Sequence, residues 1–232
     1  MLFFFLYNVG VFLALIIPVN VAYTIASIFA YIKYLFSFLE KKEIVENLKL
    51  VLPGEDSKTL KSYAREIFKN FSMYLVDFFR FKKLDLEYVK SHIEIVNKYY
   101  LDDALKKGKG VIALSAHLGN WELGGAVMGV LGYPINAIAL EHRNRLVNNF
   151  FVRQRCLKNE RVIPIGAALK RCFSVLKNNE LLAILGDKDF TNGGVVVKFF
   201  GRDTILPKGP AVFSLKTGAV IVPGFLIRKF KD

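Results

Sequence analysis

An uncharged apolar run covers residues 2–32, and Lys33 is the first charged residue of the chain. The run is longer than the roughly 20 residues that cross a bilayer as a helix. Pro18 lies near its middle, so we expect a kinked or tilted helix. Lysines follow the run and none precedes it, which favours a cytoplasmic position for the rest of the protein. We therefore predict that residues 1–39 form a hydrophobic membrane-anchor segment. One alternative is a helix buried in a soluble core. The other is a helix lying flat in the membrane interface, which is less favoured because apolar residues surround it on all sides.

Two more helices are predicted before the pattern changes. Apolar residues at helical spacing over 40–52 indicate the first, which Pro53 and Gly54 end. The second extends from Ser57, a suitable N-cap, to about Phe81. Its aromatic stripe is expected to be core or membrane-facing surface.

From about residue 91 onward, short apolar segments alternate with helical patterns. The predicted strands cover residues 93–96, 111–115, 135–140, 162–165, 181–185, 195–199 and 220–227. The predicted helices cover residues 98–107, 120–131, 144–158, 167–177 and 210–217. This alternation predicts an α/β fold with a mainly parallel central sheet flanked by helices. Residues 40–232 contain no internal repeat or linker, so we expect them to form one domain.

The composition is both apolar and basic, with 53% hydrophobic residues and a formal net charge of +13. The high apolar content suggests that part of the chain contacts lipid. The positive charge indicates an anionic partner, such as a membrane surface or an acidic protein or substrate. Lysines are interspersed with acids and no RNA- or DNA-binding motif appears, so nucleic acid is not an expected partner. Cys156 and Cys172 cannot form a disulfide framework and are expected to be idle thiols.

The segment 113–125 carries the strongest chemical signal, because a histidine follows an apolar strand and a helix comes next. Ligands bind at the ends of strands in α/β sheets, and His117 there can act as a general base. Glu122 is five positions later, which is roughly 140° away on a regular helix. The two side chains can meet if His117 lies on the turn before the helix, where Gly119 supplies backbone freedom. The carboxylate would then orient the imidazole and stabilise the imidazolium.

Other chemistries lack their motifs. His92 and His142 do not have the spacing of metal ligands with His117, so no metal is expected. No glycine-rich phosphate loop is present, and no Gly-x-Ser-x-Gly elbow of a serine hydrolase appears.

The sequence His117-Leu-Gly-Asn-Trp-Glu122 resembles the His-(four residues)-Asp/Glu motif of the lipid A late acyltransferase family, within the lysophospholipid acyltransferase superfamily. Three further segments are similar in order, namely residues 141–144 with Arg153 and Arg155, residues 185–190, and residues 197–202. The resemblance covers essentially the whole chain. It implies that His117 and Glu122 form the catalytic dyad.

The resemblance also implies a second group of site residues. Arg155 is the best match to an arginine that supports the oxyanion or the substrate, with Arg143 and Arg153 as rivals. The loop acids are expected to orient an arginine or the acceptor headgroup, although Lys188 stands where many members have glutamine. The candidate oxyanion- and substrate-binding residues are Arg155, Arg143, Gly119, Asn120, Asp187 and Asp189.

The implied activity is transfer of a fatty acyl chain from an acyl carrier protein or acyl-coenzyme A to a hydroxyl of a lipid A precursor. It needs no cofactor, and it would take place at the bacterial inner membrane with the domain on the cytoplasmic side. One alternative is an acyltransferase for another glycolipid or lysophospholipid, such as phosphatidylinositol mannoside. The other is a non-catalytic basic membrane protein that binds anionic lipid or nucleic acid. The sequence ends at Asp232 shortly after a strand-like segment, and family members commonly continue, so we expect a short or truncated C-terminus.

Overall fold

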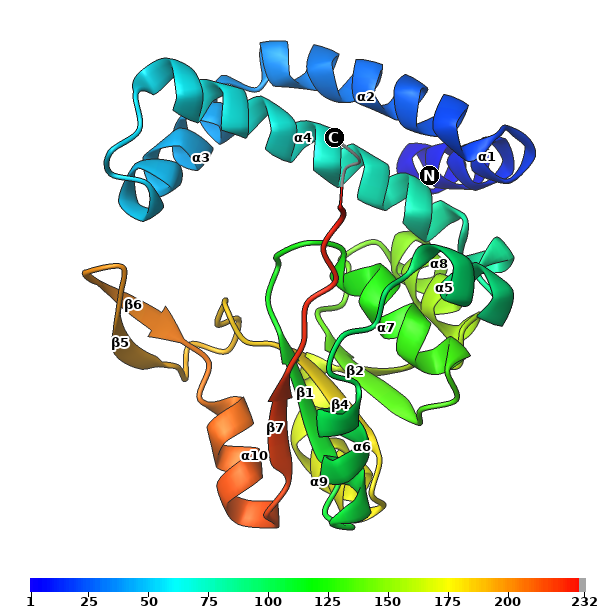
Figure 1. Cartoon of the computed structure of the whole chain (residues 1–232), viewed down its shortest axis with the longest axis vertical. Helices are drawn as coiled ribbons and strands as arrows, with labels where there is room; N and C mark the ends of the chain where they lie inside the picture. Colours follow the sequence, from blue (N-terminus) through cyan, green and yellow to red (C-terminus); the bar gives the residue numbers. More distant parts are fainter. Residues whose placement is uncertain (230–232) are drawn as a thin grey trace.

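Five parallel strands form the central sheet of the computed structural model, which describes residues 1–229 (Figure 1). Their order is β3-β2-β4-β1-β7, and every described pairing in this sheet is parallel. The strands are β1 (Val111–Ser115), β2 (Ile135–Ala139), β3 (Arg161–Pro164), β4 (Leu181–Leu185) and β7 (Val220–Pro223). The predicted α/β class with a mainly parallel sheet is therefore confirmed.

Helices cover both faces of the sheet because successive strand residues point to opposite faces. They are α6 (Tyr99–Lys106), α7 (Trp121–Val130), α8 (Arg145–Cys156), α9 (Ala168–Lys177) and α10 (Gly209–Thr217). Ile112 and Leu182 are fully buried in a core that also contains Leu176 of α9 and Phe213 of α10. The preceding residue on each strand, Val111 or Leu181, packs on the other face with Ala104 of α6 and Met128 of α7.

Four helices at the N-terminus lie across one end of the sheet domain (Figure 1). They are α1 (Leu2–Ile16), α2 (Val19–Phe36), α3 (Phe38–Val51) and α4 (Ser57–Phe79). The expected single kinked helix is two helices, because Pro18 ends the first and precedes the second. The Arg80 guanidinium stabilises this break by donating hydrogen bonds to the carbonyls of Ala14 and Ile17. Among the described helices, α2 is the one long and apolar enough to cross a membrane.

Several predicted boundaries were wrong. Residues 93–96 form no strand and follow a short helix, α5 (Leu86–His92). Asp56 rather than Ser57 caps α4, since its carboxylate accepts hydrogen bonds from the Lys58 and Thr59 amides at 2.7 and 2.8 Å. A strand was also missed: β6 (Arg202–Leu206) pairs antiparallel with β5 (Val195–Phe199), apart from the main sheet. Residues 230–232, at the C-terminus expected to be shortened, lie outside the described residues.

Candidate functional site

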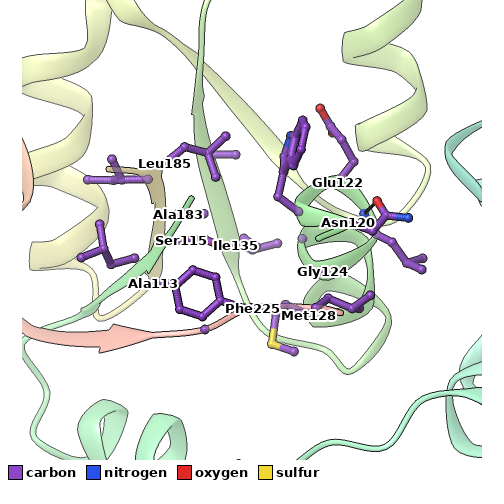
Figure 2. A pocket seen from close by; sticks show the side chains of 18 of the residues that line it. Ala113, Ser115, Asn120, Glu122, Gly124, Met128, Ile135, Ala183, Leu185 and Phe225 are labelled. Carbon is purple, nitrogen blue, oxygen red and sulfur yellow. Dashed lines mark hydrogen bonds between the residues drawn. The ribbon is translucent and has the colours of Figure 1, made fainter. Parts of the chain in front are cut away.

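A cavity of about 2520 Å³ lies at the carboxyl ends of the central strands, between the sheet, α7 and the N-terminal helices. Figure 2 shows side chains of the strands and of α7 around it. The labelled residues include Ala113 and Ser115 of β1, Ala183 and Leu185 of β4, and Glu122, Gly124 and Met128 of α7. This end of a parallel sheet is where α/β proteins bind their ligands.

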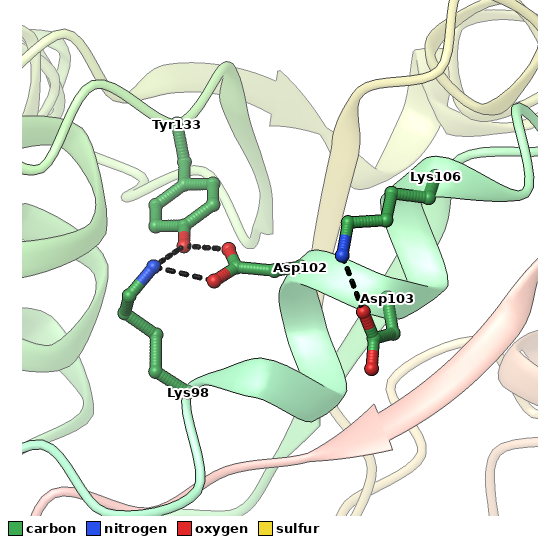
Figure 3. Close-up of polar contacts among 5 residues, drawn as sticks. All are labelled: Lys98, Asp102, Asp103, Lys106 and Tyr133. Atoms are coloured by element: carbon green, nitrogen blue, oxygen red, sulfur yellow. Dashed lines mark hydrogen bonds and ion pairs between the residues drawn. The ribbon is translucent and has the colours of Figure 1, made fainter.

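Helix α6 forms part of the wall of this cavity and is fixed to the turn before β2 by a polar cluster (Figure 3). The Lys98 ammonium donates to the Asp102 carboxylate at 2.6 Å and to the Tyr133 hydroxyl at 2.9 Å. The Tyr133 hydroxyl in turn donates to Asp102. These contacts hold α6 against the sheet domain. They lie near the amino end of β2, and not at the carboxyl ends of the strands where His117 stands.

His117 lines the cavity and forms two hydrogen bonds with Asp187. The backbone N–H of His117 donates to Asp187 Oδ2 at 2.9 Å, and the imidazole Nδ1 lies 3.0 Å from Asp187 Oδ1. β1 and β4 are neighbours whose ends are in register, with Ser115 opposite Leu185. His117 and Asp187 each stand two residues beyond these ends, so the register of the sheet brings them together.

This pair has the geometry of an oriented base. When Nδ1 donates its proton to a carboxylate, Nε2 is left as the basic nitrogen of the imidazole. The Trp121 ring contacts the imidazole edge-on, with ring centroids 4.9 Å apart, and limits its rotation. The arrangement can therefore accept a proton at Nε2 while the carboxylate stabilises the resulting cation.

Glu122 does not meet His117 as expected, because its carboxylate faces α8 and binds Arg155. The Arg155 Nε donates to Oε2 at 2.9 Å and Nη2 donates to Oε1 at 2.6 Å, which is a bidentate pair. The side chains are only 13% and 20% exposed, for Arg155 and Glu122 respectively. His117 does lie in the loop just before α7, as expected. Its side chain points toward the end of β4, whereas Glu122, in the first turn of α7, points toward α8.

Glu160 is a third ionisable residue in this region, and the sequence analysis missed it. It is buried, and its Oε2 has no hydrogen-bond partner. Burial, together with the nearby Glu122 carboxylate, raises the pKa of Glu160 to about 8, while Arg155 opposes the rise. The Arg155 guanidinium therefore lies near two carboxyl groups and is paired directly with one of them.

The free energy of unfolding is expected to fall as the pH rises from about 4.5 to about 8. Glu160 keeps its proton in the native state up to about pH 8, whereas it loses that proton from about pH 4.5 in the unfolded chain. Its contribution is thus fully present below pH 4.5 and is lost through this window. Glu160→Gln should remove this loss, so its melting temperature should exceed that of the native protein at pH 8 but match it near pH 5.

The matched control for this measurement is Glu46→Gln, because Glu46 is 59% exposed. It should leave the pH dependence unchanged. An equal slope of stability against pH in the native protein and in Glu160→Gln would contradict the assignment of this pH dependence to Glu160.

Gly119 and Asn120 shape the loop that carries His117. Asn120 caps α7, accepting a hydrogen bond from the Leu123 amide at 3.1 Å, and its side-chain amide donates to buried Asp77 of α4 at 2.9 Å. On the other side, the Asn120 N–H donates to the Leu226 carbonyl at 2.8 Å. Gly119 has φ +66°, and a side chain there would collide with that carbonyl. The loop is therefore held between α4 and the C-terminal segment.

Asp77 was missed by the sequence analysis, although a carboxylate in the apolar stripe of α4 is a signal. It accepts hydrogen bonds from Asn120, from Tyr23 of α2 and from Arg228, whose Nη2 lies 2.5 Å away. Burial raises the pKa of Asp77, while Arg228 and the hydrogen bonds oppose the rise. This carboxylate joins α2, α4, the loop after β1 and the C-terminal segment.

Two predicted site residues remain, Asp189 and Arg143. Asp189 lines the cavity but closes its own loop, accepting hydrogen bonds from the Thr191 and Gly194 amides at 3.0 and 2.9 Å. The Thr191 hydrogen bonds keep the pKa of Asp189 below its usual value. Arg143 is exposed on the loop before α8. Among the described residues, no three His, Cys, Asp or Glu side chains come together as metal ligands.

Comparison with known proteins gives consistent matches. A family model described as bacterial lipid A biosynthesis acyltransferase matches residues 1–232. A phosphatidylinositol mannoside acyltransferase of Mycolicibacterium smegmatis is 25% identical over 186 residues, which are 78% of this chain and 61% of the relative. The Mycobacterium tuberculosis protein of the same name is 30% identical over 128 residues, which are 53% of this chain and 40% of the relative.

A lipid A biosynthesis palmitoleoyltransferase of Escherichia coli is 26% identical over 196 residues, which are 83% of this chain and 63% of the relative. The matched part of this chain therefore spans less than two thirds of the length of each of these relatives.

Proposed function

The chain belongs to the bacterial lipid A biosynthesis acyltransferase family, and from this premise we propose that it transfers a fatty acyl chain from a thioester donor to a hydroxyl of a membrane glycolipid. The observation that carries the proposal is the His117–Asp187 pair at the carboxyl ends of β1 and β4. It lies beside a cavity whose lining includes apolar residues of the strands and of α7. A base beside an apolar cavity is what acyl transfer to a lipid hydroxyl needs.

In the proposed reaction, Nε2 of His117 takes the proton from the acceptor hydroxyl as its oxygen attacks the thioester carbonyl. Asp187 holds the imidazole and stabilises the imidazolium. The tetrahedral intermediate collapses, the carbon–sulfur bond breaks, and the imidazolium returns the proton to the leaving thiolate. No covalent acyl-enzyme is formed, and neither a metal nor a cofactor takes part.

The other predicted residues take supporting roles in this proposal. Arg155 lines the cavity, and its permanent positive charge stabilises the oxyanion of the tetrahedral intermediate. Both of its described hydrogen bonds go to Glu122. Glu122 acts by holding Arg155. Gly119 and Asn120 set the loop that carries His117, Asp189 shapes the loop after Asp187, and exposed Arg143 is available to an anionic headgroup.

We assign the donor to the acyl carrier protein or acyl-coenzyme A class, since both are anionic and the chain carries a net charge of +13. The acceptor is a lipid A precursor, with phosphatidylinositol mannoside as the alternative. Each acceptor is named in the description of a relative, phosphatidylinositol mannoside in the mycobacterial proteins and lipid A in the Escherichia coli protein. The proposed location is the bacterial inner membrane, with residues 40–232 on its cytoplasmic side and residues 1–39 as the membrane-associated segment.

The test is transfer of a labelled acyl chain by the full chain in detergent, with two donors and two acceptors. Acyl carrier protein and coenzyme A thioesters are each combined with a lipid A precursor and with phosphatidylinositol mannoside. We expect product with at least one combination and a clear preference between the acceptors. No product with any combination, together with salt-dependent binding of anionic lipid or nucleic acid, would instead support a non-catalytic binding protein.

A further inference from the structure

Helix α2 lies along α4 over its whole length and runs in the opposite direction (Figure 1). Near its start, the Tyr23 hydroxyl donates to Asp77. Near its end, the Tyr34 hydroxyl donates to the Lys61 carbonyl at 3.2 Å, and its ring packs edge-on against Phe68. Two small residues of α2 are buried, Ala22 next to Tyr23 and Ala30 between Tyr23 and Tyr34. Helix α2 is thus attached to α4 at both ends.

The opposite face of α2 carries a straight stripe of exposed aliphatic side chains. They are between 42% and 57% exposed and are spaced by four, three, four and three residues, which keeps them on one face of a helix. The stripe consists of Val21, Ile25, Ile28, Ile32 and Leu35. Helix α1 also exposes large apolar side chains, among them Phe3, Phe5 and Phe12.

The attachment to α4 decides how this surface can meet a bilayer. Arg65, Glu66 and Lys69 of α4 lie between the two attachment points, and Arg65 is exposed. If α2 crossed the bilayer while attached, these ionised side chains would enter the hydrocarbon with it, which is strongly unfavourable. If α2 crossed the bilayer without α4, it would have to separate from α4 and break the Tyr23–Asp77 hydrogen bond.

We propose that α1 and α2 lie in the plane of the membrane, with the stripe of α2 in the acyl region of one leaflet and α4 on the water side. An uncharged apolar surface bordered by lysines and aromatic rings matches the acyl region and headgroup level of a leaflet, so lipid is its occupant. Residues 2–32 contain no charged residue, and the run ends at Lys33, with Lys41 and Lys42 close behind it. Lys41 lies over the Tyr34 and Phe38 rings, at 4.9 and 4.7 Å from their centroids. Aromatic rings and lysines together are typical of the headgroup level.

This orientation would bring the membrane lipid next to the cavity of the proposed reaction. This part of the inference rests on the proposed function. The cavity that His117 lines also reaches Tyr7 of α1, Val19 and Tyr23 of α2, and Tyr74 of α4. In-plane helices therefore place the cavity next to the lipid surface. A glycolipid can present its hydroxyl to His117 while its acyl chains stay in the leaflet.

Helices that lie flat in one leaflet can be distinguished from a helix that crosses the membrane by the side on which single introduced cysteines react. Asn8→Cys in exposed α1 and Lys42→Cys in α3 are made in a Cys156→Ser background, because Cys156 is exposed and Cys172 is buried. A membrane-impermeant maleimide is applied to inverted membrane vesicles and to spheroplasts, and labelling is normalised to that in detergent. We expect both cysteines to react in the inverted vesicles and neither in spheroplasts. Reaction of Asn8→Cys only in spheroplasts would overturn the proposal.

A matched pair of substitutions tests the stripe itself. Ile28→Glu adds a charge at a position that is 57% exposed, and Leu215→Glu makes a comparable change on α10 at a position that is 87% exposed. Ile28→Glu should lower partition onto vesicles of phosphatidylethanolamine and phosphatidylglycerol about tenfold, while Leu215→Glu should not.

Acyl transfer to detergent-dispersed acceptor should be equal in the two variants, so a lipid-binding defect remains distinct from failure of the proposed function. Unchanged partition of Ile28→Glu would overturn the proposal. So would a native dimer that Ile28→Glu dissociates, because the stripe would then be an interface between two copies of this chain.

Discussion

His117→Ala is expected to lower kcat for acyl transfer by about 10³-fold, within the usual contribution of a general base. Asp187→Asn should lower it by about 10²–10⁴-fold, because the amide orients the ring less well and cannot stabilise the imidazolium. Both residues contact solvent, with side chains 38% exposed, so neither change should unfold the protein. The KM for the lipid acceptor should change little, since the pair acts on the reacting hydroxyl. Steady-state kinetics with circular dichroism on each variant measures both effects.

The matched control for Asp187→Asn is Asp203→Asn. Asp203 is also exposed, but it lies on the separate β5–β6 hairpin and pairs with Lys198 at 2.7 Å. It should keep native kcat. Native kcat in a folded Asp187→Asn would contradict the role of Asp187 as the partner of the base.

The sequence allowed prediction of each strand of this site but not of their order. The apolar runs that became β1 and β4 were predicted within their observed bounds. Their adjacency was not, because 70 residues separate His117 from Asp187 and only the sheet register brings them together. Local spacing favoured Glu122 instead, although the helical offset of roughly 140° already opposed that contact. Here the long-range contact prevailed over the local one.

The N-terminal region shows the same division between local and distant causes. Its apolar length and the position of Pro18 are visible in the sequence. The division into α1 and α2 also depends on Arg80, which binds the carbonyls at the break from more than 60 residues away. The missed strand β6 has no buried residue, so no apolar pattern revealed it. Asp77 could have been identified as a carboxylate on an otherwise apolar helix face.

Arg155→Leu is expected to lower the free energy of unfolding by about 3–5 kcal/mol, the usual cost of removing one partner of a buried ion pair. Two carboxyl groups would remain in a poorly solvated region without their cation, since Arg155 pairs with Glu122 and its charge also acts on Glu160. Glu122→Leu should lower the free energy of unfolding by less than Arg155→Leu does. It leaves Arg155 near Glu160, which can then ionise more easily because one neighbouring negative charge is gone.

The double variant, Glu122→Leu with Arg155→Leu, should be more stable than Arg155→Leu alone, because it leaves no unpaired charge at the position of Glu122. Chemical denaturation in detergent at pH 5 and pH 8 measures the three variants. The loss in Arg155→Leu should be larger at pH 8 than at pH 5, because Arg155 lowers the pKa of Glu160 and so opposes the loss of stability that this residue causes as the pH rises. Equal losses for both single variants with simple additivity in the double would mean that the Glu122–Arg155 pair does not couple α7 to α8.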